Sequence, residues 1–126
     1  MSLKCQTPET PNVLAIYLLS KVTEDMIKIG IDNIRRDTKY KSSLLYNTIK
    51  KHQNLSCYVN DKNIRSKTVI VSNTQKDNDL FIDGLKRKNL IVGKGYGSSI
   101  NQIRIANFPT HSKEVFELLC DELIKL

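Results

Sequence analysis

The segment from Val13 to Ile29 constrains the fold of this chain more than any other part. Its apolar residues recur at helical spacing, which predicts an α-helix. Thr10 is expected as the N-cap with Pro11 at the first helical position, and Gly30 is expected to end the helix. Most of the first half of this helix is apolar nearly all round, so it needs burial on more than one side. In a domain as small as 126 residues, this requirement indicates a missing partner surface.

A second helix is expected from about Asp32 to Lys51. Its apolar positions are sparser than those of the first helix and its other faces are charged, which indicates a surface helix. Both helices precede any predicted strand.

The second half of the chain alternates between short β-branched or aromatic runs and helical segments. Strands are predicted at residues 55–59, 67–71, 89–92 and 100–107. A helix is expected after the capping-box variant that begins at Thr74, and a last helix after Thr110 as N-cap. The last helix carries an apolar stripe at Val115, Phe116, Leu119 and Leu123. This order predicts an α+β fold, in which long N-terminal helices precede an antiparallel sheet with helices packed on it.

The composition narrows the class of protein to which this chain can belong. Apolar residues make up 40% of the chain and charged residues 26%, which is typical of a globular domain and not of a disordered one. The net charge of +7 permits binding to nucleic acid, an anionic membrane or acidic metabolites. The positive residues are mixed with acidic ones, and the densest run, at residues 86–88, falls at an expected helix C-terminus. We therefore interpret the charge as a solvated surface.

The cysteines indicate a reducing compartment. Cys5, Cys57 and Cys120 are far apart and form no CxxC pair, which argues against a disulfide framework and a zinc site. The apolar run at residues 13–19 is too short to span a bilayer, and no signal peptide is visible. We expect a cytoplasmic protein and give no structural weight to residues 1–3, which are typical of an expression leader.

Few residues form a catalytic pattern. His52 is expected at a solvated helix end and His111 in the first turn of the last helix, both in structural roles. No serine or cysteine stands in a nucleophile motif, and no two carboxylates lie at a suggestive spacing. We therefore expect no catalytic residue and no metal site in this chain.

The segment from Gly93 to Gly97 is the one glycine-rich stretch. Its glycines could let backbone N–H groups approach a phosphate, and Lys94 could pair with one. The pattern matches neither GxGxxG nor GxxxxGK(S/T), and no helix follows it. A mobile loop between two strands is the favoured interpretation, and Lys94 is a weak candidate for phosphate binding.

Arg104 lies inside an otherwise apolar predicted strand. Strand alternation places Ile103 and Ile105 on one face and Arg104 with Ala106 on the other. A guanidinium beside a small alanine and a glycine loop is placed to donate two parallel hydrogen bonds to a carboxylate. The alternative is a strand arginine that points into solvent.

Three segments resemble the phosphoserine aminotransferase family. Residues 10–17, Thr-Pro-Asn-Val-Leu-Ala-Ile-Tyr, are similar to the family stretch Asn-Thr-Pro-Pro-Thr-Phe-x-Ile-Tyr. Residues 39–46, Lys-Tyr-Lys-Ser-Ser-Leu-Leu-Tyr, are similar to the family helix Lys-Ala-x-Leu-Leu-Tyr. Residues 103–107, Ile-Arg-Ile-Ala-Asn, with Pro109, resemble the family strand Ile-Arg-Ala-Ser-Ile-Tyr-Asn. The three matches occur in the family's order and cover Thr7 to Leu126.

The resemblance implies a fold type I (class V) aminotransferase, a homodimer that uses pyridoxal phosphate. In that family a large domain carries the Schiff-base lysine, and the C-terminal small domain is an antiparallel sheet with helices. Residues 10–126 look like the connecting helices plus that small domain, after a leader and extended segment at residues 1–9. The implied partners are the large domain of the same enzyme, a second subunit, and small amino and keto acids. The resemblance implies no nucleic acid, no membrane, no activity of the chain alone and no cofactor bound to it alone.

The resemblance assigns roles to two residues. Arg104 matches the arginine that grips the substrate α-carboxylate, and Thr10 matches a threonine that reaches the cofactor phosphate of the neighbouring subunit. Two departures stand against the family pattern: Glu9 replaces an asparagine, and residues 96–98 (Tyr-Gly-Ser) replace the Gly-His-Arg that helps bind the substrate phosphate. Either Lys94 substitutes for that motif or the substrate is not phosphorylated. The implied reaction is amino transfer between glutamate and a 2-oxo acid, with 3-phosphohydroxypyruvate of serine biosynthesis as the candidate acceptor.

Two alternatives from other classes stay open. The charge and the sheet would allow a small nucleic-acid-binding module, although the predicted strands carry no pair of exposed aromatics for base stacking. A ββαββα regulatory or interaction domain is the second alternative.

Overall fold

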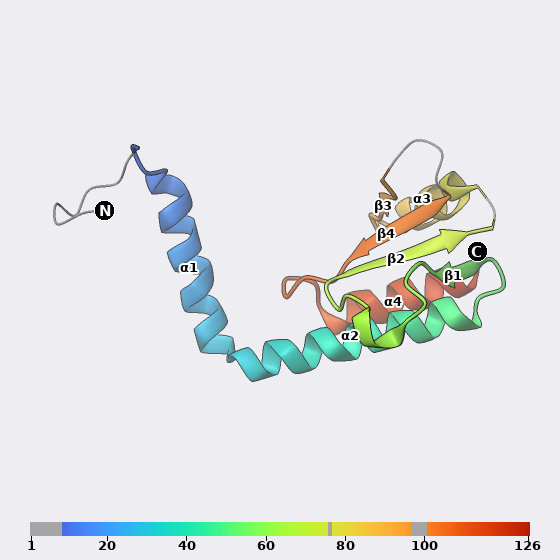
Figure 1. Cartoon of the computed structure of the whole chain (residues 1–126), viewed down its shortest axis with the longest axis horizontal. Helices are drawn as coiled ribbons and strands as arrows, with labels where there is room; N and C mark the ends of the chain where they lie inside the picture. The colour runs from blue at the N-terminus through green and yellow to red at the C-terminus, as the bar shows by residue number, and fades with distance from the viewer. Residues whose placement is uncertain (1–8, 76, 97–100) are drawn as a thin grey trace. The chain divides into compact units, whose positions relative to one another are not determined.

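The computed structural model describes residues 9–75, 77–96 and 101–126. The chain divides into two compact units, residues 1–34 and 35–126. The predicted order of two helices followed by β-β-α-β-β-α is confirmed, with one added 3₁₀ turn at Lys62–Ile64 (Figure 1). Of the expected leader at residues 1–9, all but Glu9 lies outside the described residues. None of the helices described is long and apolar enough to cross a membrane.

Helix α1, Val13–Ile29, forms most of the described part of the first unit. Its N-cap is Asn12, whose Oδ1 accepts a hydrogen bond of 3.0 Å from the backbone N–H of Ala15. The predicted cap at Thr10 is therefore wrong, because asparagine is the stronger capping residue and stands two positions later. Gly30 ends the helix as predicted: its φ of 87° suits glycine, and its N–H donates to the carbonyls of Met26 and Ile27.

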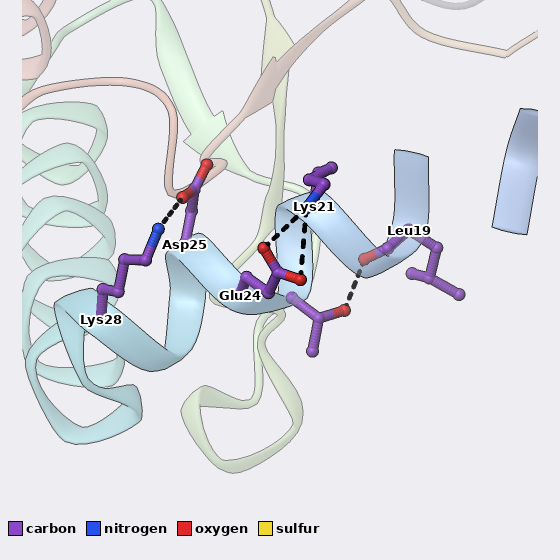
Figure 2. A network of polar contacts seen from close by, with 6 residues as sticks. Leu19, Lys21, Glu24, Asp25 and Lys28 are labelled. Carbon is purple, nitrogen blue, oxygen red and sulfur yellow. Dashed lines mark hydrogen bonds and ion pairs between the residues drawn. The ribbon is translucent and has the colours of Figure 1, made fainter. Parts of the chain in front are cut away.

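Helix α1 exposes many apolar side chains. None of its residues is buried, and nine large hydrophobic side chains are each more than half exposed; they are Val13, Leu14, Ile16, Tyr17, Leu18, Leu19, Val22, Ile27 and Ile29. Its polar contacts are local: Lys21 pairs with Glu24 at 3.1 Å, Lys28 pairs with Asp25 at 3.3 Å, and the Thr23 hydroxyl donates to the Leu19 carbonyl (Figure 2). Exposed pairs at this spacing contribute only about 0.2–0.5 kcal/mol each.

Helices α2 and α4 pack their apolar faces into the second unit. Helix α2, Ile31–Lys51, has nearly the predicted bounds, and α4 spans Lys113–Ile124. The N-cap of α4 is Ser112, so the prediction of Thr110 is wrong by two residues. In the predicted stripe of α4, Val115 is exposed and Cys120 is buried instead. The helical period that joins Phe116, Leu119 and Leu123 includes Cys120 and leaves Val115 at its edge.

The four strands form one antiparallel sheet in the order β1-β2-β4-β3 (Figure 1). Their bounds are Leu55–Cys57 for β1, Val69–Thr74 for β2, Gly93–Lys94 for β3 and Gln102–Ala106 for β4. Because β2 runs on to Thr74, the predicted capping box at Thr74 is wrong, and Asp77 caps helix α3, Asn78–Lys86. The predicted strand at residues 89–92 is also wrong. A turn with Asn89 at a φ of 60° follows α3, and pairing with β4 begins at Gly93.

One face of the sheet lies in the hydrophobic core, and the other is mostly half-buried. The core cluster joins alternate residues of β1, β2 and β4 to residues from α2, α3 and α4. Its sheet members are Leu55, Cys57, Ile70, Ile103 and Ile105, and its main helical members are Leu45, Ile49, Phe81, Leu85, Phe116, Leu119 and Leu123. The opposite side, here called the open face, carries the remaining positions of β2 and β4. These are Val69, Val71, Asn73, Gln102, Arg104 and Ala106.

Candidate functional site

Arg104 occupies the centre of the open face. Strand β4 has Ile103 and Ile105 buried on the core side, and the half-buried Arg104 between them on the other side, as the alternation predicts. Its Cα partners are Val71 of β2 and Gly93 of β3. Because paired residues on neighbouring strands point to the same face, the Arg104 side chain has a small apolar neighbour on one side and no side chain at all on the other.

The guanidinium of Arg104 lies against an aromatic ring. Its Cζ atom is 4.4 Å from the centroid of the Tyr96 ring, which is the shortest cation–π distance among the described residues. Tyr96 itself is 78% exposed. Within the described part of the chain, no carboxylate makes an ion pair with Arg104. A planar cation of this kind retains its in-plane N–H donors for an anionic ligand.

Two side-chain amides lie on the same face of the sheet, two residues along the strands from Arg104 and its partner Val71. The Gln102 side chain donates a hydrogen bond of 2.9 Å from Nε2 to Oδ1 of Asn73, across β4 and β2. Gly95 faces Gln102, and its backbone N–H donates to the Gln102 carbonyl. The open face therefore combines one guanidinium with neutral polar groups, a set that can orient a carboxylate ligand.

Lys94 lies on the other side of the sheet. Its Cα partner is Ile103, whose side chain is in the core, so Lys94 and Arg104 point to opposite faces. The Lys94 ammonium pairs with Asp79 in the first turn of α3, and this hydrogen bond raises the pKa of Lys94. The structure does not bring the two predicted binding residues together. Gly97 and Ser98, which complete the glycine-rich stretch and the Tyr-Gly-Ser substitution, lie outside the described residues.

Thr10 belongs to the first unit and is exposed. Asn12 has the capping role, which leaves the Thr10 hydroxyl free of that task. By helix geometry, the N–H groups of Val13 and Leu14 in the first turn of α1 have no acceptor within the helix. A hydroxyl followed by such N–H groups is chemically suited to an anionic group.

Lys41 and Asn107 were missed by the sequence analysis. The Lys41 side chain is buried, and its ammonium donates hydrogen bonds of 2.9 Å to the Phe108 carbonyl and 2.6 Å to the His111 carbonyl. Asn107, at the end of β4, donates from Nδ2 to the carbonyls of Thr38 and Lys67. These bonds fix the connection between β4 and α4 onto α2. Asn107 could have been noticed in the sequence, because it ends the strand motif that resembles the family. Lys41 could not, because a lysine in a charged helix is expected to be exposed.

The environment of Lys41 is electrostatically unusual. Burial lowers the pKa of Lys41, and the negative charge of Asp37 opposes part of that effect. The ammonium also lies 5.2 Å from the centroid of the Phe116 ring. Two carbonyls, a ring face and a nearby carboxylate account for a buried cation without any ligand, so this lysine is structural.

The contacts described for the two histidines are with the backbone and with aromatic rings. His52 follows α2, where its Nδ1 accepts a hydrogen bond from the Asn54 backbone and its ring meets Phe81 edge-on. His111 precedes α4 rather than lying in its first turn, and its ring lies near those of Phe108 and Phe116. Among the described residues, no three of His, Cys, Asp and Glu gather in a group that could hold a metal ion.

The sequence matches the family described as aminotransferase class-V over residues 6–112. The chain therefore belongs to the class-V aminotransferase family, whose members use pyridoxal phosphate. Within that class it is similar to a phosphoserine aminotransferase from Cytophaga hutchinsonii, with 44% identity and a TM-score of 0.88. This match covers 95% of the present chain and 34% of that chain. The matched part is homologous to the small domain of phosphoserine aminotransferase.

Two more distant structures share the fold. A second phosphoserine aminotransferase structure has 20% identity and a TM-score of 0.80, covering 93% of this chain and 33% of that one. A NifS-like protein from Rickettsia africae has 22% identity and a TM-score of 0.70, covering 93% and 35%. The chain thus spans about a third of the length of the structures it matches. No curated protein matches the sequence.

Proposed function

We propose that this chain is the small domain, with its connecting helices, of an aminotransferase that resembles phosphoserine aminotransferase. Residues 10–126 form this part, and the enzyme transfers an amino group between glutamate and a 2-oxo acid, with 3-phosphohydroxypyruvate as the candidate acceptor. The observation that carries the proposal is Arg104, a half-buried guanidinium on the open face with no acidic partner among the described residues. Every amino and keto acid of such a reaction has an α-carboxylate that this group can bind.

The remaining parts of the enzyme are partners of this chain. The uncovered apolar side chains of α1 fit a large domain that supplies the missing packing surface. A second subunit completes the homodimer, and nucleic acid and membranes have no role. Pyridoxal phosphate, when bound, supplies the electron sink for the reaction, and the lysine that carries it belongs to the large domain.

Thr10 is the proposed contact of this chain with the cofactor. Its exposed hydroxyl and the free N–H groups at the start of α1 suit the phosphate end of pyridoxal phosphate in the neighbouring subunit. Lys94 is a weaker proposal for a substrate phosphate, because the lysine would have to leave Asp79 and reach around the edge of the sheet. None of these residues makes or breaks a bond, so the chain alone is inactive.

The test of this function uses Arg104→Gln in the enzyme assembled from this chain and its large domain. Loss of a charge-assisted hydrogen-bond pair weakens binding by about 1.5–3 kcal/mol, so KM for both the amino donor and the keto acid should rise roughly ten- to a hundredfold. Arg87→Gln, a change at the exposed end of α3, controls for the loss of one positive charge. Unchanged KM values for both substrates, or turnover by the purified 126-residue chain with added cofactor, would rule the proposal out.

A further inference from the structure

The sequence analysis favoured a mobile loop over a phosphate loop for residues 93–97, but Gly93 and Lys94 form strand β3, which pairs with β4. Gly93 and Gly95 alternate along one side of β3 and its extension, facing Arg104 and Gln102 on β4. A Cβ atom on Gly95 would lie 2.6 Å from the Cβ of Gln102, and one on Gly93 would lie 3.4 Å from both Nε and Nη2 of Arg104. The glycines are therefore positions where the backbone of β3 and its extension lies close to two long side chains of β4, and Tyr96 follows directly after them.

Stacking and close approach have different effects on a guanidinium. The ring of Tyr96 contacts the face of the group and leaves its in-plane donors free for a carboxylate. Because Gly93 has no side chain, the Nε and Nη2 atoms of Arg104 can lie close to the backbone of β3. A free arginine side chain samples many rotamers, and a side chain that is already held loses less entropy when its ligand binds.

We propose that Tyr96 and Gly93 are positioning residues for Arg104, holding its guanidinium so that the in-plane donors face a carboxylate on the open face. The Tyr96 ring, and not its hydroxyl, has this role. The identity of the carboxylate as a substrate group rests on the proposed function, whereas the ordering of Arg104 by Tyr96 does not.

The first measurement follows the Arg104 Nε–Hε group by ¹⁵N NMR in the 126-residue chain without ligand. In the wild type and in Tyr96→Phe this group should be ordered and exchange slowly with solvent, whereas Tyr96→Leu should be less ordered and exchange faster. Tyr58→Leu removes another exposed tyrosine, one that has no contact with Arg104 among those described, and is the matched control. Tyr96 is mostly exposed, so the substituted chains should fold normally.

The second measurement is a titration with sodium acetate at constant ionic strength, balanced with sodium chloride. Tyr96→Leu should weaken acetate binding about two- to fivefold, the range expected for an exposed cation–π contact. Gly93→Ala should change it less than Tyr96→Leu does, because the new Cβ would lie 3.4 Å from Nε and Nη2 of Arg104, at the short limit of ordinary van der Waals contact. In an Arg104→Lys background, Tyr96→Leu should have no further effect, since the planar group it positions is gone.

The outcomes separate this inference from the proposed function. If Tyr96→Leu behaves like Tyr58→Leu in both measurements, or if Tyr96→Phe is as weak as Tyr96→Leu, the positioning role is wrong. If Arg104 is ordered by Tyr96 but Arg104→Gln leaves acetate binding unchanged, the carboxylate role under the proposed function fails while the positioning result stands.

Discussion

Lys41 holds the connection between β4 and α4 through two hydrogen bonds from its ammonium. Replacement by methionine keeps most of the side-chain volume but removes the ammonium that binds the carbonyls of Phe108 and His111. Because two partly buried acceptors then lose a charged donor, we expect Lys41→Met to lower the free energy of unfolding by about 2–4 kcal/mol. Urea denaturation followed by circular dichroism measures this change.

Lys39→Met is the matched control for that experiment. Lys39 is exposed on the same helix, two residues from Lys41, and its side chain has no contact with the loop among those described. We expect a change of less than about 0.5 kcal/mol for this variant. Equal effects of the two substitutions would contradict the structural role of Lys41.

Arg104 shows which part of the site the sequence of a single strand can predict. Strand alternation alone places its side chain opposite Ile103 and Ile105, and the structure agrees. The ring of Tyr96 and the space over Gly93 belong to the pairing of β3 with β4. Alternation within one strand carries no information on what the neighbouring strand presents, so this part of the site was not predicted.

At the scale of elements, the helix ends test the capping assignments. Ser112 caps α4 by accepting a hydrogen bond from the Val115 N–H, whereas Thr110 lies in the turn before it. Removal of an N-cap side chain typically lowers stability by about 1 kcal/mol. We therefore expect Ser112→Ala to lower the free energy of unfolding by about that amount and Thr110→Ala to have little effect, measured by thermal unfolding. The reverse order would restore Thr110 as the cap.

The boundaries of elements were predicted less well than their order. Thr10, Thr74 and Thr110 were each expected to cap a helix, and in each case a stronger capping residue (Asn12, Asp77 or Ser112) follows two or three positions later. Local sequence offers several chemically acceptable caps. Which of them is used depends on where the strand or loop before it stops pairing with its neighbours, as β2 does at Thr74.

At the scale of the whole molecule, the core does not depend on α1. Every residue of the core cluster lies at or after Leu44, and α1 buries none of its residues. A chain shortened to residues 31–126 should therefore unfold cooperatively with a Tm close to that of the full chain. Its binding of an apolar dye should fall, because the exposed side chains of α1 are gone. A large loss of cooperativity in calorimetry would contradict this prediction.

The sequence by itself determined the α+β class, the order of the elements, the helical spacing of α1 and α2, and the face on which Arg104 lies. These follow from local periodicity, which a side-chain pattern records directly. Only the tertiary structure decided that Lys94 and Arg104 point to opposite faces, that Tyr96 stacks on the guanidinium, and that Lys41 is buried. The physical reason is that these contacts join residues from different elements, and strand register and helix docking are set by packing across the sheet and core rather than by neighbours in the chain.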